Sequence, residues 1–95
     1  MGEVREVEVL IEFFPPYRES SGLNVKRVMI DGNATTIEDL LQVLLTDVQS
    51  LHKHILLQYP WQQQILIIKN NSPVKEGEII KDKDHLFFLP PLIGG

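Results

Sequence analysis

The residues best suited to chemistry are the last two of the chain, Gly94 and Gly95, which follow a short apolar run and two prolines. Glycine gives no steric shield to a terminal carboxyl carbon and lets the backbone approach a partner closely. A carboxylate is a poor acyl electrophile, because it carries negative charge and has no leaving group, so it must be activated before it can react at carbon. We therefore take the carboxylate of Gly95 as the candidate reacting group.

The residues before the glycines suit an arm that presents this carboxylate. Leu86 to Leu89 is a continuous apolar run, which predicts a strand buried on both faces. The prolines that follow have no N–H to donate to a sheet and hold φ near the extended value, so the chain must leave the sheet there. We expect residues 90–95 to form a flexible tail on a single domain spanning residues 1–95. The residues expected to contact a partner are Phe88, Pro90, Pro91, Leu92, Ile93 and Gly94.

Other candidate groups for chemistry are weaker. The sequence has no cysteine, which excludes disulfides, cysteine nucleophiles and thiolate metal sites in this chain. Two of the three histidines, His52 and His54, would face different ways on a helix, and His85 is distant from them. We therefore predict surface histidines, no metal site and no bound cofactor. Tyr59 and Trp61, on either side of a proline, are interpreted as a lid on the core.

Composition and charge limit the partners. The chain has 95 residues, 43% of them apolar, and a formal net charge of −4. This length fits one domain with one compact core. The negative charge gives no support to a nucleic-acid partner, and no apolar run approaches the length of a membrane span. The charged start of the sequence has no signal-peptide pattern, so we expect a cytoplasmic location.

Apolar segments of strand length alternate with turn signals along the chain. The first segment shows the clearest alternation of apolar and acidic residues, which is typical of a strand with one buried face. The predicted strands cover residues 7–14, 25–30, 65–69 and 86–89, with shorter apolar points around 74–80. Tyr17 to Gly22 is interpreted as a polar loop and Asn70 to Pro73 as a turn. Lys81 to Asp84 is interpreted as a solvated turn before the last strand.

One long amphipathic segment predicts the main helix. Its apolar residues recur at i, i+3, i+4 and i+7 over residues 37–55. The spacing of an N-terminal cap, a threonine followed three residues later by an acidic residue, occurs twice, beginning at Thr35 and at Thr36. Residues 47–58 either continue this helix or form a second one, and the pattern favours neither.

These elements predict an α+β domain. A single amphipathic helix must bury its apolar stripe, and a mixed sheet is the only large apolar surface available to it. The first and last strands have the strongest apolar character, so we place them inside the sheet. We expect four to five strands, with the main helix packed on one face.

Four parts of the sequence together carry a family resemblance: Phe13-Phe14 with Arg18-Glu19 and Gly22; Ala34 to Leu41; Ile67 to Asn70; and Ile80 to Asp82 with Asp84 and Leu86 to Gly95. They resemble the ubiquitin-like sulfur carriers of the ThiS and MoaD type, most closely the small subunit of molybdopterin synthase. The resemblance implies a β-grasp, or ubiquitin-like, fold. Lys83 stands where that family usually has a glycine, and a positive φ there would cost about 1 kcal/mol.

The resemblance also implies a function. The chain would be a sulfur-donating subunit that is not catalytic alone. A ubiquitin-activating-type adenylyltransferase would bind ATP and Mg²⁺ and adenylate Gly95, and a sulfur donor would convert the adenylate to a thiocarboxylate. In a molybdopterin synthase heterotetramer, the tail would enter the large subunit and donate sulfur to precursor Z during molybdenum cofactor biosynthesis.

Other functions stay open at this point. One is a sulfur carrier for thiamin, for tRNA thiolation or for an alternative cysteine route. Another is a protein modifier that forms isopeptide bonds to lysines through Gly95. A plain β-grasp binding module with an incidental tail is the last.

Overall fold

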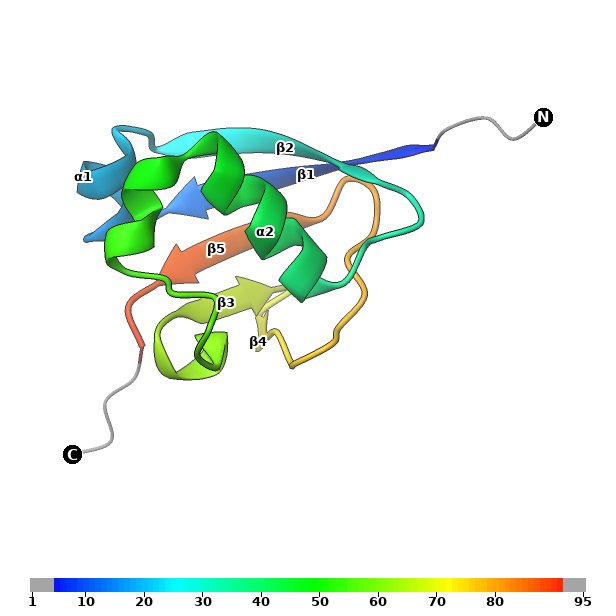
Figure 1. The fold of residues 1–95 in the computed structure, drawn as a ribbon. Coiled ribbons are helices and arrows are strands. Elements are labelled where there is room, and N and C mark those ends of the chain that lie inside the picture. The colour runs from blue at the N-terminus through cyan, green and yellow to red at the C-terminus, as the bar shows by residue number, and fades with distance from the viewer. Residues whose placement is uncertain (1–4, 92–95) are drawn as a thin grey trace.

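The computed structural model describes residues 5–91 and contains one mixed sheet (Figure 1). Its five strands are β1 (Glu6–Phe13), β2 (Val25–Asp31), β3 (Leu66–Lys69), β4 (Ser72–Pro73) and β5 (His85–Leu89). Across the sheet their order is β2-β1-β5-β3-β4. β1 and β5 pair in parallel, and the other neighbours pair antiparallel. The first and last strands therefore lie inside the sheet, as predicted.

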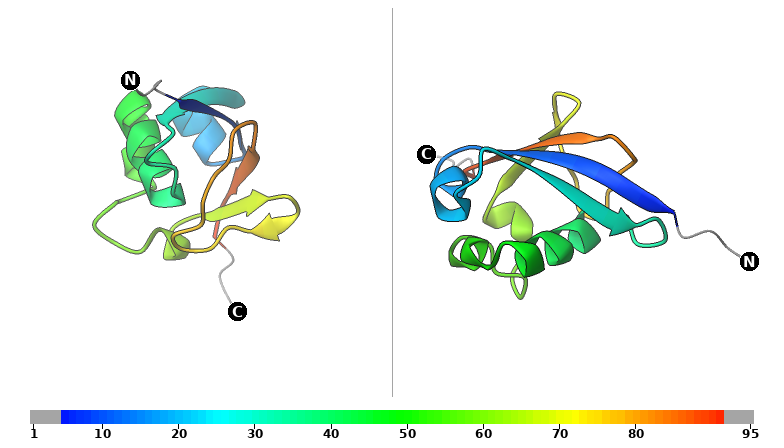
Figure 2. Two further views of the ribbon diagram at one scale, coloured as in Figure 1. Left: turned by 90° about the vertical axis from the view of Figure 1, so that its right-hand side faces the viewer. Right: turned by 90° about the horizontal axis from the view of Figure 1, so that it is seen from above.

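The main helix packs against one face of this sheet, and no helix of the described residues lies on the opposite face (Figure 2). The helical elements are α1 (Tyr17–Ser21), α2 (Ile37–Asp47) and the 3₁₀ helices η1 (Gln49–Lys53) and η2 (Trp61–Gln63). The predicted α+β arrangement, with the long helix on one face of a mixed sheet, is confirmed.

The start of α2 is a capping box at the second of the two possible positions. The hydroxyl of Thr36 accepts a hydrogen bond from the N–H of Asp39 at 3.1 Å, and the Asp39 carboxylate accepts one from the N–H of Thr36 at 3.2 Å. Two N–H groups that the helix itself leaves without partners are satisfied in this way. The alternative cap at Thr35 is not used.

The main helix ends at Asp47 and does not continue to residue 58. Val48 leaves the helical region with φ of −124° and ψ of 79°, and the separate 3₁₀ helix η1 begins at Gln49. Of the two possibilities for residues 47–58, a second short helix is the one found. Leu51 and Ile55 are nevertheless buried in the core.

The interpretation of residues 17–22 as a polar loop was wrong, because Tyr17–Ser21 forms the short helix α1. The ring of Tyr17 is almost completely buried, and its hydroxyl donates a hydrogen bond to the carbonyl of Gln64 at 3.0 Å. The helix ends at Gly22, which has φ of +73° and donates its N–H to the carbonyl of Arg18. A left-handed glycine is a common helix end, and burial of the tyrosine stabilises the turn.

The β3–β4 hairpin differs in detail from the expected turn. Asn70 and Asn71 have φ of 53° and 64°, a conformation that asparagine accepts more readily than most residues. Ser72–Pro73, which was expected to belong to the turn, forms β4. In the following segment Val74 and Ile80 are buried and Ile79 is exposed.

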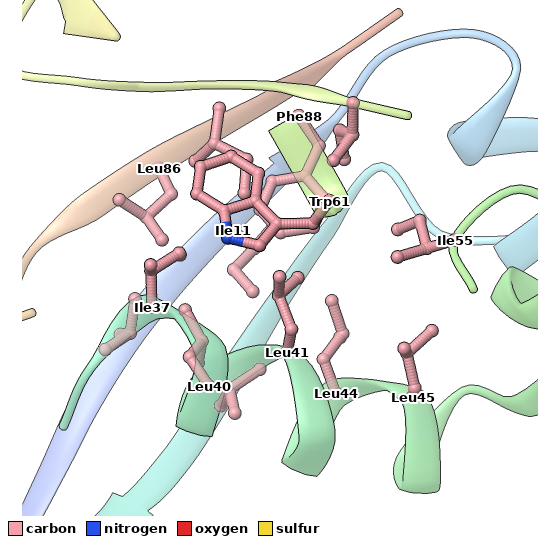
Figure 3. Close-up of a cluster of buried hydrophobic side chains, with 14 of the residues drawn as sticks. Ile11, Ile37, Leu40, Leu41, Leu44, Leu45, Ile55, Trp61, Leu86 and Phe88 are labelled. Carbon is pink, nitrogen blue, oxygen red and sulfur yellow. The ribbon is translucent and has the colours of Figure 1, made fainter. Parts of the chain in front are cut away.

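The core lies between α2 and the covered face of the sheet (Figure 3). Phe13 and Phe88, from the parallel central strands, meet edge to face with ring centroids 5.7 Å apart. Trp61 closes one side of this core, but Tyr59 is 58% exposed. The prediction of a lid therefore holds for the tryptophan and is wrong for the tyrosine.

Candidate functional site

The strand that leads to the tail is held in the sheet up to its last residue. On one side, the N–H of Phe14 donates to the carbonyl of Phe88 at 3.1 Å. On the other side, Leu89 pairs with Leu66 of β3. Pro90 and Pro91 follow directly and cannot donate to either neighbour. Strand pairing therefore stops at a defined point, where the chain emerges between the end of β1 and the start of β3.

The predicted partner contacts have different outcomes. The prediction that Phe88 contacts a partner is wrong, because its side chain has no exposed surface and belongs to the core. Pro90 is exposed and Pro91 is half-buried at the point of exit, so both remain candidates. Leu92, Ile93, Gly94 and the reacting residue Gly95 lie outside the described residues. Their roles stay predictions.

An apolar surface beside the tail was not recognised from the sequence as a single site. The residues of β1, β3 and β5 whose side chains alternate with the buried ones share the face of the sheet opposite α2. We call this the open face; its apolar residues, each half-buried, are Leu10, Leu66, Ile68, Phe87 and Leu89 of these strands, with Phe14, which directly follows β1 and lies beside Phe87. The expectation that the last strand is buried on both faces is therefore only half right.

The centre of the open face is aromatic. The ring of Phe87 stacks on that of His85 with centroids 4.5 Å apart, and it lies 6.2 Å from the ring of Phe14. Nε2 of His85 is 3.5 Å from a carboxylate oxygen of Glu12. Only alternation along β5 could have suggested this cluster, because its members come from strands far apart in the sequence.

The turn before β5 is bound to β1. The N–H of Lys83 donates to the carbonyl of Glu8 at 2.7 Å, and the N–H of Glu8 donates to the carboxylate of Asp82 at 2.8 Å. Lys83 has φ of 71°, so the positive φ considered from the sequence is present. These hydrogen bonds, with that from Leu10 N–H to the Asp84 carbonyl at 3.0 Å, set the register of β5 against β1. Residues 81–83 of this turn are exposed, as predicted, whereas Asp84 is half-buried. The turn also positions the strand that carries the tail.

A lysine joins β3 to the segment that precedes β5. Nζ of Lys69 lies 3.0 Å from Glu78 and 3.5 Å from Asp84. Burial opposes the charge of Lys69, but the hydrogen bond to Glu78 and the nearby Asp84 carboxylate outweigh burial and raise its pKa. The pKa of Glu78 is lowered, first by the hydrogen bond from the backbone of Lys75 and then by Lys69.

The histidines have structural surroundings. His54 is half-buried, lies edge to face with Tyr17, and has Nε2 2.6 Å from the hydroxyl of Ser20. His52 is exposed. Within residues 5–91 no group of three or more histidine, aspartate or glutamate side chains is arranged to hold a metal ion. The same part of the chain contains no helix that could cross a bilayer.

Solved structures with this fold support the β-grasp assignment. SAMP1 from Haloferax volcanii is 25% identical in sequence and has a TM-score of 0.78. The alignment covers 93% of this chain and 99% of the SAMP1 chain. A putative molybdopterin converting factor, subunit 1, from Pyrococcus furiosus is 18% identical, with a TM-score of 0.75 and coverages of 90% and 99%. SAMP1 from Methanosarcina acetivorans is 22% identical, with a TM-score of 0.66 and coverages of 96% and 99%.

The domain is thus a β-grasp, ubiquitin-fold protein. The model of the ThiS family matches residues 11–95, so the chain belongs to the ThiS family of sulfur-carrier-like proteins. No curated protein sequence gave a significant match.

Proposed function

We propose that this chain is a sulfur carrier and acts as the small subunit of a molybdopterin synthase. The observation that carries the proposal is the placement of β5. This strand is held on both sides, emerges beside an apolar open face, and leads into the Pro-Pro-Leu-Ile-Gly-Gly segment. Membership of the ThiS family and the fold shared with a putative molybdopterin converting factor subunit support it.

The proposed chemistry takes place at Gly95. A carboxylate oxygen attacks the α-phosphorus of ATP, pyrophosphate leaves, and an acyl-adenylate forms. Sulfide supplied by a sulfur donor then attacks the acyl carbon, the bond to AMP breaks and AMP leaves, and a thiocarboxylate and a proton remain. ATP and Mg²⁺ bind to an adenylyltransferase of the ubiquitin-activating type, so this chain contributes the acyl group and the recognition surface. In a heterotetramer with the large subunit, the sulfur passes on to the pterin precursor.

The open face is the proposed recognition surface for these partners. Protein interfaces are enriched in aromatic residues at their centre, and Phe87 with Phe14 forms such a centre next to the tail. Phe87→Arg should lower kcat/KM for adenylation by tenfold or more, since a buried aromatic anchor commonly contributes about 2 kcal/mol. Tyr59→Arg is the matched control, because Tyr59 is an exposed aromatic residue that lies outside the open face. Equal activity of the two variants would argue against this surface.

Intact mass spectrometry tests the chemistry at the tail. Protein purified from its native host should gain the mass difference between one sulfur and one oxygen atom. A variant without Gly95, and one with a residue added after it, should show no gain while keeping the circular dichroism of the wild type. An extended variant that transfers sulfur at the wild-type rate would contradict the proposal. Copurification of a larger subunit would distinguish molybdopterin synthase from a carrier in thiamin or tRNA thiolation.

A second candidate function is protein modification. The observation that favours it is the similarity to the Haloferax volcanii structure described as small archaeal modifier protein 1, which has a TM-score of 0.80 at 23% identity. A tagged form of the chain expressed in its host should then appear in high-mass conjugates that are lost when Gly95 is deleted. Absence of such conjugates, together with the sulfur mass gain, would leave the carrier role alone.

A further inference from the structure

Among residues 5–91, the free edge of β2 has an unused set of backbone hydrogen-bonding groups. In this part of the chain β2 is the outermost strand on its side of the sheet and pairs only with β1 (Figure 1). Gly32 N–H donates to the carbonyl of Arg5 at 2.7 Å, and Phe13 N–H donates to the carbonyl of Asn24 at 2.8 Å. These two hydrogen bonds, one at each end of the strand, show that the even-numbered residues direct their backbone N–H and C=O groups toward β1. The odd-numbered residues therefore direct N–H and C=O toward the free edge.

The odd-numbered residues of β2 are also its exposed ones. Val25 and Met29 are each 44% exposed, and Arg27 and Asp31 are exposed as well. Within residues 5–91 the carbonyl of Asp31 has one other partner, the N–H of Ala34 at 2.9 Å, and a carbonyl can accept a second hydrogen bond. A seven-residue edge of this kind is a template for pairing with another strand.

The charges on this edge select one way of pairing it with itself. In a twofold antiparallel pair centred on Met29, Met29 faces Met29 of the other copy, and Arg27 faces Asp31 at two equivalent places. A pair centred on Arg27 places two arginines opposite each other, and one centred on Asp31 places two aspartates opposite each other. Both arrangements are unfavourable. A pair centred on Val28 places Arg27 opposite Met29 and Asp31 opposite Val25, so it forms no pair of opposite charges.

The Met29-centred arrangement also agrees with the backbone. Its directly opposed odd-numbered residues turn their outward N–H and C=O groups toward each other, so they meet as hydrogen-bonded pairs. The side chain of Arg27 is 67% exposed and 3.5 Å from Glu8, an ion pair that leaves most of the guanidinium accessible. One carboxylate oxygen of Asp31 accepts from Asn33 N–H at 2.9 Å, and the other accepts no hydrogen bond within residues 5–91.

We propose that β2 pairs antiparallel with β2 of a second copy of this chain, about a twofold axis at Met29. The two sheets would join into one continuous sheet. β2 and the tail-bearing β5 lie on opposite sides of β1, so both tails and both open faces stay accessible. The proposal is therefore independent of the proposed function. Edge pairing alone buries less surface than a stable dimer needs, so the dimer should be weak, with Kd of about 100 µM or higher.

A cysteine cross-link tests the register. Hydrogen-bonded antiparallel pairs have Cα atoms about 5.5 Å apart, within the range of about 4.4–6.8 Å that a disulfide requires. Because the chain has no cysteine, Met29→Cys should form one disulfide-linked dimer with oxidised glutathione. Val25→Cys is the matched control, since it is equally exposed and lies on the same strand face. In the Met29-centred pair, the cysteine at position 25 would face Asn33 of the other copy. The two cysteines would then be about eight residues apart along the strands, or about 26 Å. Equal cross-linking of both variants would overturn the register.

Sedimentation equilibrium of the unmodified protein tests the association. The mean mass should rise above the 10.9 kDa monomer as the concentration increases from about 10 µM to about 1 mM. Arg27→Glu and Asp31→Lys should each raise Kd about tenfold, because two attractive pairs become repulsive. Combining the two substitutions should restore the wild-type Kd. A constant monomer mass would overturn the second copy as the occupant of this edge, and failure of the double variant to recover would overturn the Arg27–Asp31 pairing.

Discussion

The carboxylate of Glu38 connects three parts of the chain, and its removal should strongly destabilise the domain. Glu38 lies in the first turn of α2. One of its oxygens accepts from the indole Nε1 of Trp61 at 2.8 Å, and both accept from the N–H of Gly77, at 3.0 and 3.1 Å. Trp61 is 6% exposed, so its N–H cannot easily turn to water. Glu38→Ala would leave a nearly buried donor without a partner.

The expected loss follows from these contacts. A hydrogen bond to a charged group contributes about 1.5–3 kcal/mol, and an unpaired buried donor costs about 1–3 kcal/mol. The N–H of Gly77 is exposed and can bind water instead, so the indole carries most of the effect. We expect the free energy of unfolding of Glu38→Ala to fall by about 2–4 kcal/mol. For a domain of this size, Tm should then fall by roughly 10 °C or more.

Urea denaturation followed by fluorescence is the assay, because Trp61 is the only tryptophan in the chain and reports on its own environment. Glu19→Ala is the control: Glu19 is exposed and its ion-pair partner is the neighbouring Arg18, so its loss should be below about 0.5 kcal/mol. Circular dichroism would follow Trp61→Phe and the double variant with Glu38→Ala. A double-mutant cycle should give a coupling of about 1 kcal/mol or more. Additive effects, or a loss in Glu38→Ala no larger than in the control, would refute this reasoning.

Three further predictions concern the elements around the tail. Lys83→Gly should raise the free energy of unfolding by about 0.5–1 kcal/mol in urea titration, because φ of 71° strains lysine but not glycine. A variant less stable than the wild type would contradict this strain. The contribution of Glu78 to stability should be complete above about pH 4.5 and be lost as the pH falls through its lowered pKa; urea midpoints of Glu78→Gln should fall less on acidification than those of the wild type. Phe88→Ala should cost about 3–5 kcal/mol by calorimetry or urea titration because the ring is fully buried, whereas Phe87→Ala should cost clearly less; equal losses would contradict the assignment of faces.

Much of the fold could be predicted from local patterns. Alternation marks β1, and i, i+3, i+4 spacing marks α2, because each pattern reports the side chains that face a core within one element. The helix start was predictable to within one residue, since a capping box has a fixed spacing. The end of α2 was not, because residues 47–58 keep their apolar spacing whether the backbone is α-helical or turns into η1.

Other features depended on contacts between distant segments. The ring of Tyr17 is buried by the fold, with its hydroxyl on Gln64, and nothing in the polar residues after it signals a helix. The choice of Phe88 as the partner contact failed for a similar reason. Both phenylalanines are apolar neighbours, and only the position of α2 determines which face of β5 is covered.

By itself, the sequence determined the family resemblance, the mixed sheet with one main helix, and the point at which strand pairing must stop, because two prolines remove the donors that pairing needs. The tertiary structure alone decided which surfaces are available to partners. The open face and the free edge of β2 are defined by cross-strand register and by the face that α2 covers, and these depend on packing between residues as far apart as Leu10 and His85.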